Sequence, residues 1–567
     1  MKPILYAAAI AALMTPGLTS AQPVSGIAPT AAAPTMPAHQ EAFMPMRDGT
    51  VLAANVYLPA GTGPWPVILQ RTPYLKDPDP TRVPPQMLTG LTASINRYTA
   101  GGYAFVVQDV RGKGHSKGFY SAFNDDIPDG YDTVEWAAKQ PWSNGKVGIT
   151  GGSALGITAN MAAISAPPHL VAAYVIVAPN DRSANSYMGG ALKDKDTIGW
   201  TKGQGASDEV LDGIRRGVVS NVISVRGDMS QGMAYIRIPI YNIGGWYDIF
   251  NSGNIYNFQY LQNQGAAGAR GNQKLFMGPF GHGPLSGDLA YPGLDRATAS
   301  AADEMRWWDY WLKGVQNGIM DEPPVHVVMM ASARKGDFSP KNRIMAFANW
   351  PPASRAVNYY VTADHGLTTT PPTVVDAKLS YKFDPAHPVP TVGGANLTFE
   401  RGPMDQRAIP DRPDYLRFET PALDHDVAIA GHVSVDVWGA TDGPDTDFMA
   451  KLVDVYPDGY EALVLDAPIR ARYRDGRMPD QIKMMTPGAP EKLTIDMWNT
   501  AITFEKGHHI ELVITSSNAP RFDVNQNNGA EPGDKTTPLR IATNSIYLDK
   551  THPTSIVLPV IYPDDVK

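Results

Sequence analysis

The sequence predicts two unlike parts, an α/β domain built on a mostly parallel sheet and, after it, an all-β domain. From residue 41 to about residue 350, short apolar runs alternate with helix-like segments, which is the rhythm of βαβ units. After about residue 350, strand-like segments follow one another with few helices between them. The chain has 567 residues, too many for one hydrophobic core, so two or three domains are expected.

The first part of the α/β domain is expected over residues 41–180. The turn sequence Arg47-Asp48-Gly49-Thr50 lies between the segments 43–46 and 51–58, an arrangement typical of a hairpin. Asp129 is the predicted cap of a helix that continues to Gln140. Apolar runs that suit strands covered on both faces follow one another at 66–70, 103–107, 146–150 and 171–177.

The strand-and-helix rhythm stops between residues 181 and 233. This stretch is polar, Gly-rich and weakly helical, with 209–218 as its best helix candidate, and we interpret it as an insertion that covers the domain as a cap. The strand pattern resumes at 236–243, so the second part of the α/β domain is expected over 234–350. Its last helix is predicted near 301–313, followed by Gly314 as a C-terminal stop.

Residues 351–567 show the two-residue periodicity of strands with one buried face. Pro457-Asp458-Gly459 is a hairpin turn signal in this region. The clearest alternation of apolar with smaller or polar residues runs through Val427, Ile429, Val433, Val435 and Val437, and again through Ile510, Leu512 and Ile514. The region is therefore predicted to be an antiparallel sandwich.

Composition excludes several classes of function. The net charge is −8 and no run of basic residues stands out, so nothing favours a nucleic acid as partner. The chain has no cysteine, which excludes disulfides, thiolate metal sites and a cysteine nucleophile.

The N-terminus has the pattern of a secretory signal. Lys2 precedes an apolar stretch from Ile4 to Met14, and Thr19-Ser20-Ala21 offers small residues for cleavage. We expect residues 1–21 to be a signal peptide cleaved after Ala21, the alternative being a buried N-terminal helix. Residues 22–40, rich in Pro, Ala and Thr, are expected to be a flexible leader. No other apolar segment is long enough to cross a bilayer, so the mature protein is expected to be soluble and secreted or periplasmic.

The segment Gly151-Gly152-Ser153-Ala154-Leu155-Gly156 carries the strongest chemical signal. It lies between an apolar strand-like run and a helix of small residues. A serine on such a tight strand-to-helix turn exposes its hydroxyl, and the N–H groups of the helix start point at whatever binds there. Glycine-flanked serines are also common in ordinary loops, so partner residues have to decide between the two interpretations.

A serine nucleophile needs a base and a carboxylate that orients the base. In a sheet with helices on both faces these follow the serine in the order Asp, His, on loops after later strands. Asp248 and His282 fit, because each lies in a glycine-rich loop after an apolar run. Asp248 as a turn cap and His282 as a solvated loop histidine are the alternatives. His115 and His326 are other candidate bases, but His115 precedes the serine and His326 lies past the last expected strand of the sheet.

Acyl transfer also requires donors for the oxyanion. The N–H of Ala154 has the right position after the serine, and Tyr74, in the loop after an earlier strand, offers a phenolic donor. A packed loop tyrosine is the alternative for Tyr74. Three aromatic residues near these loops are predicted to line a substrate pocket, with burial in the core as their alternative: Trp246, Phe250 and Phe280.

These residues together resemble the CocE/NonD hydrolases, the Xaa-Pro dipeptidyl-peptidase-like (peptidase S15) group that includes cocaine esterase and α-amino-acid ester hydrolases. The matching motifs, in chain order, are Arg71-Thr72-Pro73-Tyr74, Gln108-Asp109-Val110-Arg111-Gly112 with Ser116 and Gly118, Gly151 to Gly156, Gly245-Trp246-Tyr247-Asp248 and Gly278-Pro279-Phe280-Gly281-His282. The resemblance implies an α/β-hydrolase domain with a helical cap and a C-terminal jelly-roll domain. It also implies Ser153 as nucleophile, His282 as base, Asp248 as its orienter, and an oxyanion hole formed by Tyr74 and the Ala154 N–H.

We therefore expect an exported serine hydrolase that cleaves a small-molecule ester, or an amide, through an acyl-enzyme, with no metal or organic cofactor. Two departures from the family bear on the substrate. Ala154 stands where tyrosine is common, and Ile249, Phe250 and Asn251 follow Asp248 where α-amino-acid ester hydrolases place carboxylates for a substrate ammonium. An Xaa-Pro dipeptidyl-peptidase-like or α-amino-acid ester/β-lactam acylase activity is the second hypothesis, and an inactive hydrolase with a glycan- or surface-binding β domain the third. A homo-oligomer is left open.

Overall fold

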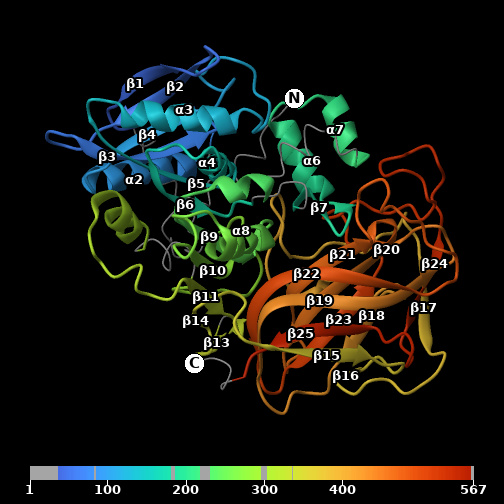
Figure 1. Ribbon diagram of the computed structural model, residues 1–567. Helices are drawn as coiled ribbons and strands as arrows, with labels where there is room; N and C mark the ends of the chain where they lie inside the picture. The colour runs from blue at the N-terminus through green and yellow to red at the C-terminus, as the bar shows by residue number, and fades with distance from the viewer. Residues whose placement is uncertain are drawn as a thin grey trace, which may run out of the picture.

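The computed structural model describes residues 36–81, 83, 85–179, 185–217, 230–294, 303–334 and 336–562. Figure 1 shows an α/β domain, blue to yellow-green, beside an all-β domain in orange and red. The predicted fold class, an α/β domain followed by an antiparallel β domain, is confirmed. The predicted signal peptide and most of the predicted leader lie outside the described residues. Within them, no helix has both the length and the apolar character that crossing a bilayer requires.

The α/β domain is organised around one mixed sheet. In the described part of the chain it has ten strands, in the order β1 (Gln40–Pro45), β2 (Val51–Tyr57), β4 (Ala104–Asp109), β3 (Trp65–Thr72), β5 (Ser143–Gly152), β6 (Leu170–Ile176), β9 (Ile240–Tyr247), β10 (Lys274–Gly281), β11 (Val325–Met329) and β14 (Arg343–Phe347). The strands from β4 to β11 are parallel, and antiparallel strands lie at both edges. The carboxyl ends of the parallel strands therefore share one edge, where ligands bind in open α/β sheets.

Helices cover both faces of this sheet. On one face α3 (Asp126–Ala138) and α4 (Ala154–Ile164) share an apolar core with the strands. On the other face lie α2 (Pro85–Ala100) and the helix that runs from residue 303 into η3 (Asp309–Lys313). The last helix was predicted, with its end at Gly314, which has a φ of 77°. Helix α2 was not predicted, although Leu88, Leu91, Ile95 and Tyr98 are buried at helical spacing.

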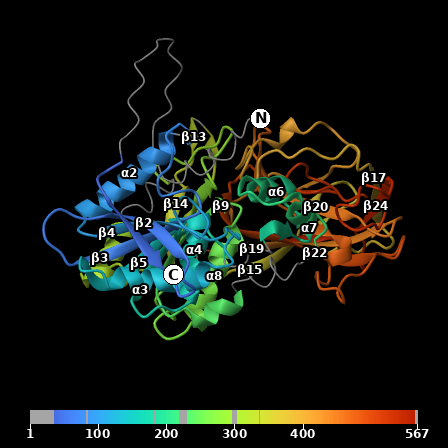
Figure 2. The ribbon, with the colours of Figure 1, turned by 90° about the horizontal axis from the view of Figure 1, so that it is seen from above.

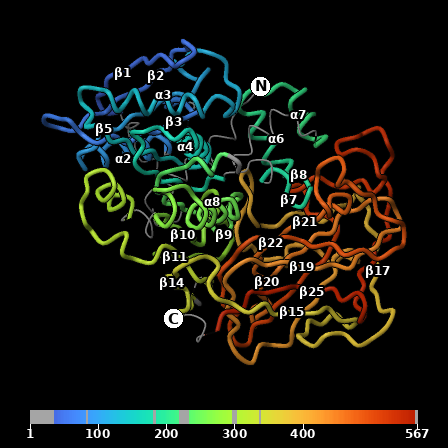
Figure 3. The backbone as a smooth tube through the Cα atoms, viewed as in Figure 1, coloured from blue at the N-terminus to red at the C-terminus, as the bar shows by residue number. Residues whose placement is uncertain are grey.

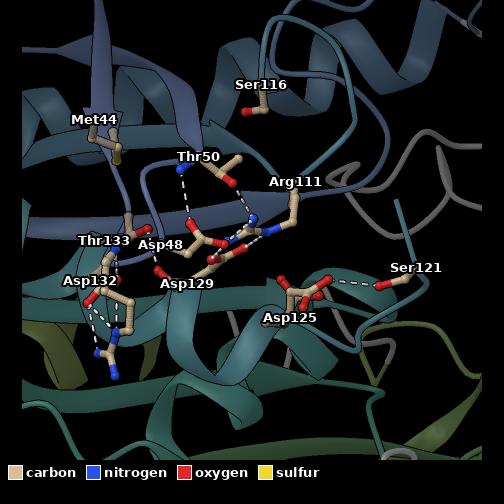
Figure 4. A network of polar contacts seen from close by, with 12 residues as sticks. Met44, Asp48, Thr50, Arg111, Ser116, Ser121, Asp125, Asp129, Asp132 and Thr133 are labelled. Carbon is tan, nitrogen blue, oxygen red and sulfur yellow. Dashed lines mark hydrogen bonds and ion pairs between the residues drawn. The ribbon is translucent and has the colours of Figure 1, made fainter. Parts of the chain in front are cut away.

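Helix α3 corrects one predicted boundary. It begins at Asp126, so Asp129 lies in its first turn instead of capping it. The carboxylate of Asp129 bonds to a side chain instead of a helix N–H group: Arg111 donates to it through Nε and Nη2 at 3.0 and 2.6 Å. The same guanidinium donates to Asp48 at 2.7 Å and to Thr50 at 2.6 Å. Figure 4 shows Arg111 between the turn of the β1–β2 hairpin and α3, so this side chain ties the first hairpin to the helical layer.

The predicted insertion contains two helices, α6 (Asp194–Gly203) and α7 (Asp208–Arg215), preceded by the short hairpin of β7 (Tyr187–Met188) and β8 (Ala191–Leu192). Helix α7 is the predicted one, shorter at its C-terminal end than expected, and Ser207 caps it through Val210 N. Helix α6 was not predicted because only two of its side chains, Asp196 and Ile198, are buried, too few to give a periodic pattern. Figures 1 and 2 place both helices on the side that faces the β domain.

The β domain consists of two antiparallel sheets, as predicted. In the described residues the larger sheet has β16 (Leu367–Thr368), β15 (Arg355–Val361), β25 (Ser555–Val560), β19 (Val427–Thr441), β24 (Ala542–Tyr547) and β17 (Lys378–Phe383), with β22 (Glu491–Phe504) also paired to β19. The smaller has β18 (Leu416–Glu419), β23 (His509–Thr515), β20 (Asp447–Val455) and β21 (Glu461–Arg470). The predicted turn at 457–459 joins β20 to β21, and the tube in Figure 3 follows the chain through both sheets.

The two domains are joined by backbone hydrogen bonds. Met330, just after β11, donates to Ala501 O at 3.0 Å, and Thr503 N donates to Met330 O at 2.8 Å. The central sheet of one domain therefore runs directly against β22 of the other, and one apolar core extends across the junction. This fixes the β domain beside the carboxyl edge of the parallel strands.

The junction of β5 and α4 depends on a close approach at Gly151. A Cβ atom at Gly151 would lie 2.4 Å from the backbone C and O of Leu155, which is far inside contact distance. At the neighbouring Gly152 the nearest atoms would be 3.7 and 3.8 Å away, which is ordinary contact. Only the first glycine is therefore required for the helix to start so close to the strand.

We predict that Gly151→Ala lowers the free energy of unfolding by about 1–3 kcal/mol, the usual cost of forcing an extra group into a packed region. Gly152→Ala is the matched control and should change it by much less. Denaturant midpoints of the two variants measure the difference. Equal stability of the two alanine variants would show that the β5–α4 turn is not sterically constrained at Gly151.

Candidate active site

Three residues predicted from the sequence lie at the carboxyl ends of parallel strands. Ser153 follows β5, Asp248 follows β9 and His282 follows β10. These strands lie close together in the sheet, with only β6 between β5 and β9. The topology therefore brings together three residues that are far apart in the sequence.

Ser153 sits in a strained turn between β5 and α4. Its φ of 56° and ψ of −125° lie outside the regions that side-chain-bearing residues normally adopt. The turn is held on both sides, because Ser153 N donates to Ile176 O at 2.9 Å and Ile157 N donates to Ser153 O at 2.9 Å. The serine is thus fixed at the N-terminus of α4, whose free N–H groups attract negative charge.

The three side chains form a hydrogen-bonded chain. The Oγ of Ser153 lies 2.7 Å from Nε2 of His282, and Nδ1 of the same ring lies 2.8 Å from Oδ2 of Asp248. A carboxylate can only accept, so Nδ1 carries the proton towards Asp248 and Nε2 is left to accept the serine O–H. This is the geometry in which a histidine can take a proton from a serine.

The charged end of this chain is held away from water. Asp248 and His282 have no exposed surface, and Ser153 is 8% exposed. The second oxygen of Asp248 accepts from the Phe250 N–H at 2.7 Å. The Phe250 ring packs edge-on against the His282 ring, with 5.4 Å between the ring centres. The imidazole is therefore fixed in one orientation by a hydrogen bond and an aromatic contact.

A cavity of about 630 Å³, including its open mouth, lies over Ser153. Its apolar wall is formed by Phe123, Ala154, Ile157, Trp200, Ile249, Phe250 and Leu397. Phe123 and Trp200 stack with an interplanar angle of 6°. Trp200 belongs to α6 of the insertion and Leu397 to the β domain, so both cover the cavity. An apolar pocket with a few polar groups in its wall has the character of a site for a small organic ligand.

The two predicted oxyanion donors are placed differently. Ala154 lines the cavity as the first residue of α4. Tyr74 is partly buried, and its hydroxyl accepts from the indole Nε1 of Trp200 at 3.0 Å. Burial raises the pKa of Tyr74 to about 12, so its O–H proton stays available for donation. The hydroxyl thus contacts Trp200, a wall residue of the cavity, while its role as an oxyanion donor stays a prediction.

Of the three aromatic residues predicted to line the pocket, the structure brings only Phe250 to it. Trp246 is 1% exposed, donates to Val328 O at 2.9 Å and packs against Trp350. Phe280 lies in the core under the sheet. Their assignment to the pocket is wrong because Trp246 and Phe280 lie within the extended ends of β9 and β10, where side chains turn into the layers that cover the sheet.

Two charged wall residues were missed by the sequence analysis. Lys193, at the start of α6, and Asp196, within it, both line the cavity and are 2% and 5% exposed. The carboxylate of Asp196 accepts from Leu397 N at 2.8 Å, Thr398 N at 3.0 Å and Thr398 Oγ1 at 2.8 Å. A short polar helix gives no sign that its charges point inward, so only the fold reveals them.

A second Ser-His-Asp trio lies at the junction of the domains. His508 Nδ1 is 2.8 Å from Asp454 Oδ1, and its Nε2 is 3.3 Å from Ser332 Oγ. All three are almost completely buried, and the His508 ring packs on Tyr456 at 4.5 Å. Unlike Ser153, Ser332 has no positive φ and does not line the cavity described above.

The other candidate histidines lie elsewhere. His115 is exposed, with Nδ1 2.6 Å from Glu41 Oε1. With Asp77 these two form the one group in the described residues whose donor atoms are close enough for a metal ion, but the ammonium of Lys76 lies between the carboxylates, 2.7 Å from Glu41. His326 is on β11, where burial lowers its pKa. Neither histidine lies near Ser153 Oγ, which His282 contacts.

Comparison with known proteins identifies both domains. Residues 48–218 match the X-Pro dipeptidyl-peptidase (S15 family) domain, and residues 317–557 match the X-Pro dipeptidyl-peptidase C-terminal non-catalytic domain. Cocaine esterase of Rhodococcus sp. (strain MB1 Bresler) is 28% identical over 593 residues, which cover 92% of this chain and 98% of that protein. A putative serine esterase of Mycobacterium bovis is 26% identical over 643 residues, 93% of this chain and 96% of that protein.

Solved structures share the whole architecture. An aminopeptidase from a marine sediment Thaumarchaeota archaeon superposes with a TM-score of 0.77 at 24% identity, over 96% of this chain and all of that one (100%). An α-amino acid ester hydrolase gives a TM-score of 0.75 at 24% identity, over 95% and 100%. A CocE/NonD family hydrolase from Staphylococcus aureus gives 0.70 at 18%, over 92% and 93%. The two domain matches and the full-length relatives together identify the chain as a hydrolase with the domains of the X-Pro dipeptidyl-peptidase (S15) family and with the fold of the CocE/NonD hydrolase.

Proposed function

We propose that the protein is a serine esterase that works through an acyl-enzyme, with Ser153 as nucleophile, His282 as general base and acid, and Asp248 as the residue that orients the imidazole. The observation that carries this proposal is the continuous hydrogen-bonded chain from Asp248 through His282 to Ser153, at the floor of a largely apolar cavity. The full-length relatives described as esterases support the choice of an ester over a peptide bond.

The proposed reaction assigns a residue to each step. His282 Nε2 takes the Ser153 proton as Oγ attacks the ester carbonyl, and Asp248 stabilises the resulting imidazolium. The negative oxygen that forms is stabilised by the Ala154 N–H at the start of α4 and by the Tyr74 hydroxyl. His282 then returns the proton to the leaving alcohol, and water, deprotonated by the same nitrogen, releases the acid.

An aminopeptidase-like or amino-acid ester activity is the second candidate, because Asp196 places a carboxylate in the cavity wall. That carboxylate already accepts three hydrogen bonds from Leu397 and Thr398, so it favours an amine less than a free carboxylate would. Of the residues that follow Asp248, Ile249 and Phe250 line the cavity and carry no charge. Turnover of alanine p-nitrophenyl ester, measured with a free and with an N-acetylated amine, distinguishes the simple esterase from the amine-requiring activity. A strong preference for the free amine would favour this second candidate.

Export to the periplasm or out of the cell remains part of the proposal, on the pattern of residues 1–21 alone. N-terminal sequencing of the protein recovered outside the cytoplasm should start at Gln22. An intact Met1 on the mature protein would remove export from the proposal.

We predict that a fluorophosphonate probe labels the protein at Ser153 and that Ser153→Ala abolishes labelling. Ser332→Ala is the matched control, because Ser332 also contacts a histidine that contacts an aspartate but has no positive φ and does not line the cavity over Ser153. It should label as the wild type does. Peptide mass mapping identifies the labelled residue.

Labelling that survives Ser153→Ala would overturn the assignment of the nucleophile. An unlabelled wild type that turns over no activated ester but binds a glycan would instead support the inactive-scaffold hypothesis.

We predict that Tyr74→Phe lowers kcat for a p-nitrophenyl ester by about 10²–10³-fold with little change in KM, because an oxyanion donor acts on the transition state. Steady-state kinetics measure both constants. Tyr256→Phe, an exposed tyrosine on α8 (Asn251–Gln264), is the control for the substitution itself. A kcat within threefold of the wild type would mean that Tyr74 is only a packing partner of Trp200.

A further inference from the structure

Lys193 is a buried cation in the wall of the cavity that holds Ser153. Its Nζ donates to the carbonyl oxygen of Ile249 at 3.1 Å and lies 4.5 Å from the centre of the Trp498 ring. An ammonium group has three N–H donors, and one carbonyl with one aromatic face is a sparse environment for a buried charge. Among the residues that the structure describes, none offers Nζ a carboxylate at ion-pair distance.

Lys76, another buried lysine of this chain, has contacts of a different kind at its Nζ. Lys76 is 1% exposed, and its Nζ contacts Glu41, Asp77 and Asn55. Its charge is thus neutralised by carboxylates of the protein itself. Lys193 is similarly buried but lines an open cavity, which leaves room for a partner that the described residues do not supply.

The charged groups around Lys193 are already bonded to other partners. Asp196, on the same helix, accepts three hydrogen bonds from the β domain. Asp248 is held by His282 and Phe250. Arg521 and Asp466, both in the β domain, pair with each other.

These surroundings leave the cation undercompensated. Burial, and next the charge of Arg521, lower the pKa of Lys193 to about 7, while Asp196, Asp248 and Asp466 act in the opposite direction. A negatively charged group entering the cavity would stabilise the protonated lysine, and the apolar wall around it would strengthen the attraction by excluding water.

We propose that Lys193 forms an anion subsite of the cavity, so that the preferred substrates are esters carrying a carboxylate within reach of Ser153. This inference rests on the proposed esterase function and adds the chemical class of the substrate to it. Lys193 would act in binding and not in the chemical step. The alternative is a purely structural lysine that holds the Ile249 carbonyl, and with it the loop after Asp248.

The test compares charged and neutral substrates that are otherwise alike. The p-nitrophenyl hemiesters of succinate and glutarate are each paired with their methyl-capped diester, and 4-acetoxybenzoate is paired with its methyl ester, so the carboxylate lies on either side of the reacting bond. The measured quantity is the ratio of kcat/KM for the charged substrate to that for its neutral partner. One charge-assisted hydrogen bond should make this ratio about tenfold to a hundredfold larger in the wild type than in Lys193→Met for at least one pair. The difference should arise chiefly from a lower KM of the wild type for the charged substrate.

Lys195→Met is the matched control. Lys195 lies on the same helix, two residues away, and is exposed, so its substitution should leave the ratio as in the wild type. Lys193→Arg keeps a cation at the site and should retain most of the preference. Fluorophosphonate labelling of Ser153 confirms that each variant has folded with its nucleophile intact.

The pH dependence gives a second readout that a structural lysine would not produce. The substrate carboxylate stays ionised above about pH 5, while Lys193 loses its proton as the pH rises through about 7. The ratio should therefore fall between about pH 6 and about pH 8 in the wild type, and be flat in Lys193→Met. Any pH effect on the chemical step is shared by both substrates of a pair and cancels in the ratio.

Two results would overturn the subsite while leaving the esterase proposal standing. One is efficient turnover of the neutral esters by the wild type with no preference for any charged partner. The other is an equal loss for both members of each pair in Lys193→Met, which identifies a structural role. Failure of the esterase proposal itself looks different: no ester is turned over and Ser153 is not labelled.

Discussion

The hydrogen bond between His282 and Asp248 is fully buried, and its geometry depends on the loops after β9 and β10 that carry the two residues. An ionised carboxylate out of water costs several kcal/mol unless donors surround it, and Asp248 obtains them from the His282 ring and the Phe250 N–H. The loops that supply these groups end β9 and β10, two neighbouring strands whose register is set by the sheet. The position of the His282 ring thus follows from strand pairing. Ser153 completes the hydrogen-bonded chain from β5, two strands away from β9 in the sheet.

The β domain contributes residues to the site, although the family domain that it matches is described as non-catalytic. Leu397 lines the cavity, and the adjoining backbone is fixed by the carboxylate of Asp196 on α6. Asn251, three residues after Asp248, donates to Asn499 O on β22 at 3.0 Å. The loop that carries Asp248 is therefore held by contacts from both domains. The backbone hydrogen bonds at Met330, which fix the two domains against each other, thus help to position the site. In our proposal the same arrangement leaves Lys193 facing the cavity with its charge only partly compensated.

The sequence predicted the parts of this structure that depend on local or repeating patterns. The serine turn, the order of Ser153, Asp248 and His282, and the two-residue alternation along β19 are readable because each depends on residues at fixed spacing. Trp246 and Phe280 were assigned to the wrong environment because apolar aromatics after a strand look alike whether they face a cavity or the core. Helix α6, Lys193 and Asp196 were missed because the β domain contributes to their burial. Leu397, which contacts Asp196, lies 201 residues after it, and no local pattern encodes that contact.

The central claim is that Ser153 becomes covalently acylated during turnover. The most direct measurement is rapid acid quenching of the reaction with a p-nitrophenyl ester, followed by peptide mass mapping. Our account predicts an adduct of the acyl mass on the peptide that contains Ser153. When deacylation is slow, this adduct should form together with a burst of p-nitrophenol that is stoichiometric with the enzyme. Replacing His282 by alanine should abolish the adduct. An acyl group on any other residue, or full turnover without one on Ser153 even when deacylation is slowed, would contradict it.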